Sequence, residues 1–278
     1  MKIFKNLFRV AGAIVLGFGV ASGAQAVPFY WTDWTGTDLL PGTPFQAQGT
    51  ITTTSSSVTV TYTNQNGVGF YQPSGGIDYW ANGSGSIGGR DDAISPYTST
   101  LVDNAPMGTD IIALSKAGSQ TLSFSEIITN PVFAFNSLNF NGYAFDQDFE
   151  ILSIGGVDGN ACGYWGCGGI SKVVVDLGGG NFEYQLNSNN IGGSEPHGTI
   201  RFVDSFDTLT WRSSTDEYWN GFTVGVQGTA VEVCTLNPSL PECQSVSTPE
   251  PASVLLYILG LVMLGMTRRR MVLAEFKS

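Results

Sequence analysis

Apolar and polar residues alternate along many short segments of this chain, and that two-residue period limits its fold more than any other feature. Val58, Val60 and Tyr62, for example, are separated by threonines. Such alternation predicts a β-strand with one buried face, because successive side chains of a strand point in opposite directions. No stripe with the 3.6-residue period of a helix competes with it between the two ends of the chain. The pattern recurs at residues 122–124, 133–135, 182–186, 209–211 and 222–226.

Some of these runs carry more specific expectations. Val173–Val175 is a continuous β-branched run, which predicts a strand buried on both faces. After Phe133 and Phe135, the apolar residues Leu138 and Phe140 continue on a new register, which predicts a β-bulge. Further strand candidates are residues 111–114 and 149–154, with a closing pair of strands at 207–212 and 220–226.

Glycine-rich turns separate the apolar runs. Neighbouring glycines occur at residues 75–76, 88–89, 155–156, 178–180 and 192–193. Many short strands joined by such turns predict an all-β protein, an antiparallel β-sandwich of jelly-roll type, over residues 27–233. The segment 72–89 is expected to be a loop. Residues 234–248 are expected to be a disulfide-containing linker, with a stiff, extended spacer from residue 237 onward.

The region between the two chain ends is strongly acidic. Residues 27–251 hold five basic and 22 acidic residues, a formal charge of −17, whereas the whole chain carries −11. A surface of this kind repels phosphate groups, so nucleic acid is not an expected partner. It also tends to attract divalent cations.

The N-terminal residues 1–26 have the organisation of a secretory signal peptide. Lys2, Lys5 and Arg9 form a basic region, and residues 10–20 are apolar. Ala24 and Ala26 form an A-x-A cleavage site, so signal peptidase is expected to leave Val27 as the mature N-terminus. The sequence therefore predicts export.

The C-terminal residues 249–278 have three parts in order. The tripeptide Pro249, Glu250, Pro251 precedes an apolar run of 15 residues, Ala252–Met266, and the cluster Arg268, Arg269, Arg270 follows it. An apolar run with arginines on one side predicts a membrane-seeking helix whose basic end stays in the cytoplasm. The run is shorter than the roughly 20 residues that span a bilayer comfortably, which suits a transient inner-membrane anchor.

This order of parts resembles the PEP-CTERM sorting signal of Gram-negative bacteria that make extracellular polysaccharide. The resemblance is confined to the C-terminal segment. It implies that exosortase, a membrane-embedded transpeptidase-like enzyme, recognises Pro249, Glu250 and Pro251 and removes the helix. The chain departs from the family pattern because it continues beyond Arg270 to Ser278. An ordinary single-pass anchor is the alternative interpretation of the same residues.

Four cysteines occur in a chain that is expected to be exported, which favours disulfide bonds. Three pairings are open. Sequence spacing favours two local bridges, Cys162 with Cys167 and Cys234 with Cys243. A zinc site is the alternative, but paired C-x-x-C spacing is missing and His197 is the single histidine of the chain.

Few residues indicate catalysis or metal binding. Asp146, Asp148 and Glu150 have two-residue spacing and are expected on one face of a strand. Carboxylates placed so are able to ligate calcium or to hydrolyse a glycoside, and they also serve simply as a soluble surface. His197 lies in a turn-like segment without a G-x-S-x-G nucleophile motif, so it is expected to be a solvated loop residue. No catalytic residue is assigned.

Aromatic pairs are a more distinctive feature. Tyr164 and Trp165 lie inside the short Cys162–Cys167 loop, which leaves little room to bury both rings. Exposed rings of this kind offer flat apolar faces on which sugars stack. Tyr164 and Trp165 are therefore the predicted glycan contacts, and core packing is the expectation for most of the other aromatic residues.

Together these features predict a non-enzymatic β-sandwich delivered to the cell surface or the extracellular matrix. Its expected partners are signal peptidase and exosortase during export, and extracellular polysaccharide afterwards. No cofactor is expected, apart from calcium at the acidic run. The alternative is a secreted jelly-roll glycan hydrolase or lyase that uses carboxylates such as Asp146 and Glu150.

Overall fold

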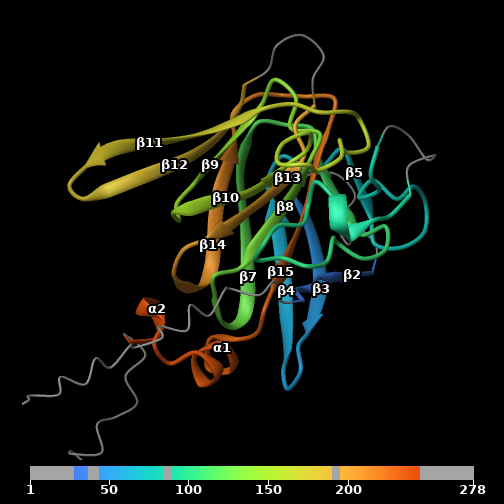
Figure 1. The fold of residues 1–278 in the computed structure, drawn as a ribbon. Coiled ribbons are helices and arrows are strands. Elements are labelled where there is room, and N and C mark those ends of the chain that lie inside the picture. The colour runs from blue at the N-terminus through green and yellow to red at the C-terminus, as the bar shows by residue number, and fades with distance from the viewer. Residues whose placement is uncertain (1–27, 37–43, 84–88, 190–194, 245–278) are drawn as a thin grey trace, which may run out of the picture.

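Two antiparallel β-sheets form most of the structure, a computed structural model that describes residues 28–36, 44–83, 89–189 and 195–244 (Figure 1). The strands of the first sheet are β1 (Tyr30–Trp31), β5 (Phe70–Gln72), β6 (Ile111–Leu114), β8 (Val132–Asn136), β10 (Phe149–Ile154), β13 (Gly198–Phe202) and β15 (Asn220–Val226). They are arranged in the order β10-β13-β8-β15-β6-β5, and β1 also pairs with β15.

The second sheet has eight strands in the order β11-β12-β9-β14-β7-β4-β3-β2. Their bounds are β2 (Asp33–Thr35), β3 (Phe45–Thr52), β4 (Ser57–Asn64), β7 (Gly118–Thr129), β9 (Gly142–Phe145), β11 (Ile170–Gly178), β12 (Asn181–Ser188) and β14 (Ser205–Ser213). Every described strand pairing is antiparallel. The prediction of an all-β fold with antiparallel sheets is confirmed.

Aromatic rings from both sheets meet in one core. Phe133 of β8 stacks on its neighbour Phe222 of β15, with ring centroids 5.0 Å apart and an interplanar angle of 3°. From the opposite sheet, Trp211 approaches Phe133 edge-on at 5.6 Å. Tyr62 of β4 likewise reaches across to Phe222 at 5.2 Å. Because these side chains are almost fully buried, the sheets pack face to face around them.

The alternation in the sequence matches the buried faces of several strands. Val58, Val60 and Tyr62 of β4 are fully buried, and Leu122 and Leu209 lie in the same core. Strands β6 and β10 occupy the segments predicted for them. In β8 and β15 every residue is buried, because these central strands are covered on both faces.

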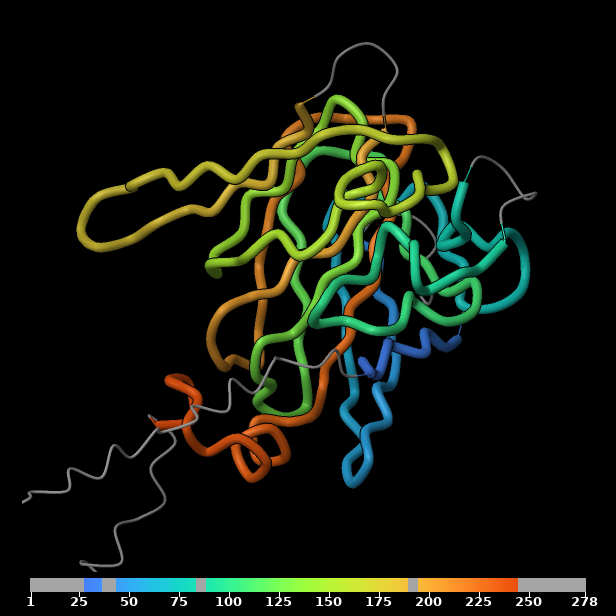
Figure 2. The backbone as a smooth tube through the Cα atoms, in the orientation of Figure 1, coloured from blue at the N-terminus to red at the C-terminus, as the bar shows by residue number. Residues whose placement is uncertain are grey.

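The strand predicted at Val173–Val175 is present, but the prediction that it is buried on both faces is wrong. These residues belong to β11, the last strand of the second sheet, and none of them is buried. With β12, β11 forms a hairpin arm that projects from the body of the sandwich, drawn in yellow in Figure 2. The arm extends beyond its neighbour β9 and beyond the body of the sandwich, and side chains of its outer half are exposed. Phe182 is exposed on this arm for the same reason, although it alternates like a core residue.

The predicted bulge after Phe135 is also wrong. Strand β8 ends at Asn136, and the chain leaves the sheet with positive φ angles at Ser137 (58°) and Phe140 (49°). This turn places Phe140 on the surface. The strands predicted at 207–212 and 220–226 are confirmed, since these residues lie in β14 and β15, the last two described strands, which belong to opposite sheets.

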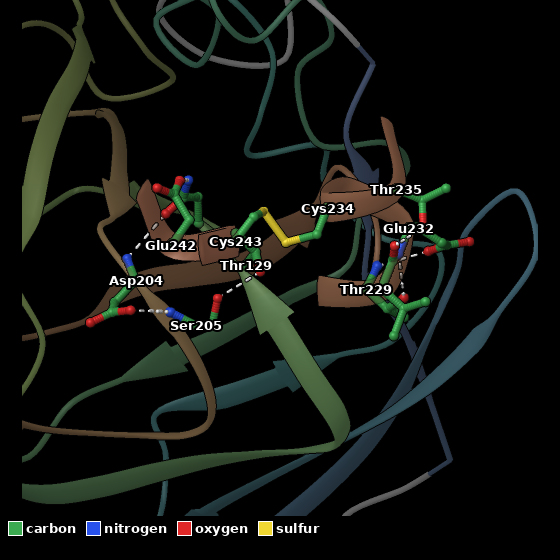
Figure 3. Close-up of a disulfide and its surroundings, with 11 residues drawn as sticks. Thr129, Asp204, Ser205, Thr229, Glu232, Cys234, Thr235, Glu242 and Cys243 are labelled. Carbon is green, nitrogen blue, oxygen red and sulfur yellow. Dashed lines mark hydrogen bonds between the residues drawn. A yellow bond between two sulfur atoms is a disulfide. The ribbon is translucent and has the colours of Figure 1, made fainter. Parts of the chain in front are cut away.

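The segment after β15 contains two short helices, and the second, at 241–244, lies where an extended spacer is predicted from residue 237 onward. Thr229 caps the N-terminus of α1 (Ala230–Leu236), and Glu232 completes a capping box (Figure 3). A turn then leads to α2 (Pro241–Gln244), and the Cys234–Cys243 disulfide joins the two helices. Proline suits the start of α2, because the N–H groups of the first helical turn have no acceptor within the helix and the missing N–H of proline therefore costs no hydrogen bond.

Side-chain hydrogen bonds connect these two helices to the sandwich. The carboxylate of Glu232 accepts hydrogen bonds from the hydroxyls of Thr53 and Ser55 in the β3–β4 turn. Burial by itself raises the pKa of Glu232. The hydrogen bonds from these hydroxyls and from backbone amides outweigh burial, so the pKa is lowered to about 2. Glu242 of α2 accepts from the side chain of Asn130, in the turn after β7. The last described residue, Gln244, is therefore held at the end of the sandwich where β15 finishes.

Both predicted disulfides are present, and such bonds are typical of proteins in oxidising compartments outside the cytoplasm. Within the described ranges, no helix has the length and apolar character needed to cross a membrane. The predicted signal peptide and the apolar run 252–266 lie outside the described residues.

The aromatic core predicts a large difference between two phenylalanines. Phe133→Ala should lower the free energy of unfolding by about 3–5 kcal/mol, because it removes a ring that is packed on all sides. Phe182→Ala, on the exposed arm, should change it by less than about 0.5 kcal/mol. Urea denaturation followed by tryptophan fluorescence measures both, and equal losses would contradict the assignment of the core.

Candidate functional site

The Cys162–Cys167 loop forms a very tight hairpin. Gly163 and Gly166 exchange two backbone hydrogen bonds, of 2.9 and 3.1 Å, so Tyr164 and Trp165 form its two-residue tip. The disulfide closes the loop behind them, with Cα atoms 4.7 Å apart. Only Gly fits at position 163, because a Cβ there would lie 2.2 Å from the ring of His197. The two aromatic residues are therefore held in a fixed orientation.

The two rings of this tip have different roles. Tyr164 is buried, whereas 47% of Trp165 is exposed, so only half of the predicted pair is a surface residue. Tyr164 lies edge-on beneath Trp165, with ring centroids 4.9 Å apart. The ring centroid of Tyr79 lies 5.1 Å from that of Tyr164 and 5.0 Å from that of Trp219, so these rings pack together below Trp165. Trp165 thus stands on a packed aromatic support.

A cavity of about 420 Å³ opens beside Trp165. It is lined by Ser137, Asn139, Phe140, Trp165, Glu195, Asp216, Glu217, Tyr218 and Trp219, and we call it the Trp165 pocket. Three aromatic side chains of the pocket are exposed to solvent. Phe140 is 65% exposed and Tyr218 is 93% exposed, and Trp165 is the third. A larger cavity of about 530 Å³ near Asp92 and Asp158 has no aromatic side chain among its described lining residues.

The walls of the Trp165 pocket are fixed by hydrogen bonds between two loops. The side-chain oxygen of Asn141 accepts from the backbone amides of Ser214 and Thr215, each at 3.1 Å. In return, the hydroxyl of Thr215 donates to the carbonyl of Phe140 at 3.0 Å. These bonds hold the turn after β8, which carries Phe140, against the loop before β15, which carries Tyr218.

Two glutamates give the pocket its polar character. Glu217 accepts hydrogen bonds from the side chain of Asn220 at 2.8 Å and from the backbone amide of Asn139 at 3.1 Å. Burial raises the pKa of Glu217 to about 7. The hydrogen-bond donors lower this pKa, whereas the nearby charge of Glu195 raises it. Glu195 itself accepts from the hydroxyl of Ser137 at 2.5 Å. Near neutral pH, Glu217 is therefore able both to accept and to donate a hydrogen bond.

The third acidic residue of the pocket is bound on its other side. Asp216 accepts from the backbone amide of Ala117 at 2.8 Å and from Lys116 at 2.9 Å. The hydrogen bond from the Ala117 amide, and to a smaller extent the one from Lys116, lowers the pKa of Asp216. Asp216 thus remains an anion at the rim, where it forms an ion pair with Lys116.

His197 is not the solvated residue that its turn-like sequence predicted. It is fully buried, and burial lowers its pKa to about 3, so the ring is neutral. Its Nδ1 atom lies 3.1 Å from the hydroxyl of Tyr97, and that hydroxyl accepts a hydrogen bond from Asn136. Asn136 also donates to the carbonyl of Tyr79 at 2.5 Å. This buried network holds the hairpin of Trp165 and the loop of Tyr79 together.

The predicted acidic run does not form a common site. Asp146 accepts from Thr210, Asp148 pairs with Lys172, and Glu150 pairs with Arg201. Only Glu150 lies within a strand, so the three carboxylates do not share one strand face as expected. Within the described residues no group of three or more His, Cys, Asp or Glu side chains is placed to hold a metal ion.

The pocket was only partly visible in the sequence. The small disulfide loop predicts Trp165 as a surface contact, but no pattern in the sequence assigns Phe140, Glu195, Glu217 or Tyr218 to a site. The Tyr218-Trp219 pair repeats the Tyr164-Trp165 pattern, which is the one signal that linked the two segments. Other residues selected from the sequence lie outside the described ranges: Ala24, Ala26, Val27, Pro249, Glu250, Pro251, Arg268, Arg269 and Arg270.

Comparison with known proteins gives no relative from which a function could be transferred: the chain matches no protein-family model, no curated protein and no solved structure.

The buried glutamate predicts a specific pH dependence of stability. The pKa of Glu217 rises from 4.5 to about 7 on folding, so the unfolded chain loses this proton more readily. The free energy of unfolding should therefore decrease as pH rises from about 4.5 to 7. Glu217→Gln should remove that part of the decrease, because glutamine does not titrate.

Urea denaturation at pH 5 and pH 8 measures this effect as the difference between wild type and variant. Glu126→Gln, at an exposed position of β7, is the matched control and should keep the wild-type pH dependence. An unchanged pH dependence in Glu217→Gln would contradict the raised pKa.

Proposed function

We propose that this chain is an exported, jelly-roll-like β-sandwich that binds extracellular polysaccharide through the Trp165 pocket and has no enzymatic activity. The observation that carries the proposal is the combination of three exposed aromatic rings with carboxylates in one rigid cavity. Sugar rings have apolar C–H faces that pack on aromatic rings, and hydroxyls that form hydrogen bonds with carboxylates. The pocket offers both kinds of contact side by side.

The charge of the pocket favours uncharged sugars. Glu195, Asp216 and Glu217 line it, and no basic residue is among its described lining residues. A uronate or a phosphorylated sugar would bring a like charge into this partly buried space, which is unfavourable. We therefore infer that neutral sugar units are the ligand class.

The position of the pocket suits a surface protein. Strand β15 begins at Asn220 beside the pocket and ends at Val226, close to α1. Seven strand residues span roughly 20 Å, so the pocket residues just before β15 and the helix α1 just after it are separated by the length of this strand. An anchor after Gln244 would join the chain beyond α2, whereas the pocket lies at the other end of β15.

Export and sorting complete the proposal. The two disulfides fit an oxidising destination. The resemblance of residues 249–278 to the PEP-CTERM signal implies a transient inner-membrane anchor, exosortase processing, and release to the cell surface or the extracellular matrix. Within that pathway the sandwich is the delivered cargo.

Glycan hydrolysis is the alternative function, and one observation favours it. Glu217, with its pKa near 7 and Glu195 nearby, has the protonation behaviour of a general acid. Asp146 and Glu150, the carboxylates that the sequence suggests for hydrolysis, accept hydrogen bonds from Thr210 and Arg201, respectively. Release of reducing ends that disappears in Glu217→Gln would establish hydrolysis, whereas binding without release supports the proposed function.

The binding proposal predicts that loss of either exposed ring weakens the interaction. Trp165→Ala and Tyr218→Ala should each reduce affinity for a neutral polysaccharide such as dextran or xylan by about tenfold or more, because stacking area is lost. Alginate, a polyuronate, should bind more weakly than the neutral polymers. Affinity electrophoresis of the purified chain on gels containing each polymer measures the effect.

Leu236→Ala is the control for that experiment, since it shortens an exposed apolar side chain of α1, outside both the pocket and the β11–β12 arm, and should retain wild-type binding. If the chain binds none of a broad panel of neutral polysaccharides, or if all three variants bind equally, the Trp165 pocket is not a glycan site.

The sorting proposal predicts a change in processing. Replacing Pro249, Glu250 and Pro251 together by alanine in the producing cell should leave a larger, membrane-retained species, because the recognition residues are gone. Immunoblots of membrane and medium fractions measure size and release. Release of a product of unchanged size would contradict recognition at these residues.

A further inference from the structure

The outer edge of β11 is an unusual surface for a β-sandwich. It ends the second sheet, so one side of its backbone has no strand partner in the described structure. Open edges of this length are normally blunted, because they template pairing with another chain. Here the edge is left open along the β-branched run Val173–Val175, and the ladder becomes irregular only at the tip, between Asp176 and Gly178.

The same edge is apolar and accessible. Val174 is 52% exposed and Leu177 is 62% exposed, on an arm that projects from the body of the sandwich (Figure 2). Phe182 of β12 adds a ring opposite Asp176 in the hairpin. An exposed apolar edge with a free backbone side combines the two features that strand addition uses.

The sequence of β11 is complementary to itself. In an antiparallel pair centred on Val174, Val173 of one copy lies opposite Val175 of the other, and Lys172 lies opposite Asp176. Three apolar pairs are then flanked at each end by a pair of opposite charges, and both kinds of cross-strand pair stabilise a sheet. Lys172 already contacts Asp148, so the added Asp176 would extend an existing ion pair.

We propose that two copies of this chain associate through antiparallel pairing of their β11 strands about a two-fold axis at Val174. The second sheets of the two copies then form one continuous sheet. Such an interface is isologous, with the same residues on both sides, and closes as a dimer. Its small area makes the association reversible and dependent on concentration.

The dimer has a functional consequence that rests on the proposed glycan binding, whereas the pairing itself does not. Two copies carry two Trp165 pockets, which raises the avidity for a polymer with repeated sugar units. The dimer would therefore cross-link or grip polysaccharide more firmly than one copy does.

Light scattering after size-exclusion chromatography, over a dilution series, tests the pairing. Wild type should shift from monomer toward dimer as concentration rises. Asp176→Lys places like charges at both ends of the interface and should raise the dissociation constant at least about tenfold. The charge swap Lys172→Asp with Asp176→Lys, combined with Asp148→Asn so that no carboxylate is left beside position 172, should restore the dimer, since the opposite charges face each other again.

Val174→Arg places two like charges on the two-fold axis and should also give a monomer, whereas Val231→Arg, at an exposed position of α1, should dimerise like wild type. Circular dichroism melting of each variant separates loss of pairing from loss of folding.

A cross-linking experiment keeps the test independent of charge effects. Cysteines that face each other in an antiparallel pair lie within the Cα distance that a disulfide bridges. Val174→Cys should therefore form a covalent dimer on mild oxidation, and Val231→Cys should not. Wild type that stays monomeric at every concentration, together with no cross-linking of Val174→Cys, would overturn the proposal. Because neither readout involves a glycan, that outcome leaves the binding test unaffected.

Discussion

Face-to-face packing of aromatic rings from two sheets is the interaction on which the rest of this structure depends. Phe133 and Phe222 stack within the first sheet, and Tyr62 and Trp211 approach them from the second. The burial of such large apolar rings is the main favourable contribution to folding, and their edge-on contacts add to it. The same strands then determine where the loops emerge. The end of β8 and the start of β15 lie next to each other, as Asn136 pairs with Gly221, so the loops with Phe140 and Tyr218 meet.

The Trp165 pocket depends on this core through a second layer of contacts. His197 precedes β13 and is buried against Gly163, so the strand fixes the position of the disulfide hairpin. Tyr97 and Asn136 connect the same histidine to the loop of Tyr79. Exposed aromatic rings on a surface are costly unless a ligand covers them, and rigid support lowers the entropy lost when a ligand binds. The arrangement therefore combines exposure with rigidity, as a binding site requires.

The β11–β12 arm is a counterexample to the rule that alternating or β-branched runs are buried. Val173–Val175 and Phe182 have the composition of core residues, yet none of them is buried, because the arm projects from the body of the sandwich. A strand pattern shows which side chains share a face, but whether that face meets another layer depends on the length of the neighbouring strands. The acidic run shows the same limit, since Asp148 and Glu150 find separate cations, Lys172 and Arg201.

The pattern of residues was sufficient to predict the all-β class, the strands around Val60 and Leu122, and both disulfides. These features are local: alternation follows from the geometry of a single strand, and the two cysteine pairs are close in the chain. The helices α1 and α2 escaped prediction because they are short, and because the β-branched Val231, Val233 and Thr235 of α1 suit a strand as well as a helix. Burial of His197, the meeting of Glu195 with Glu217, and the exposure of Val174 are of another kind. Each depends on which distant segments pack together, because desolvation and charge proximity arise only when the two sheets and their loops are assembled.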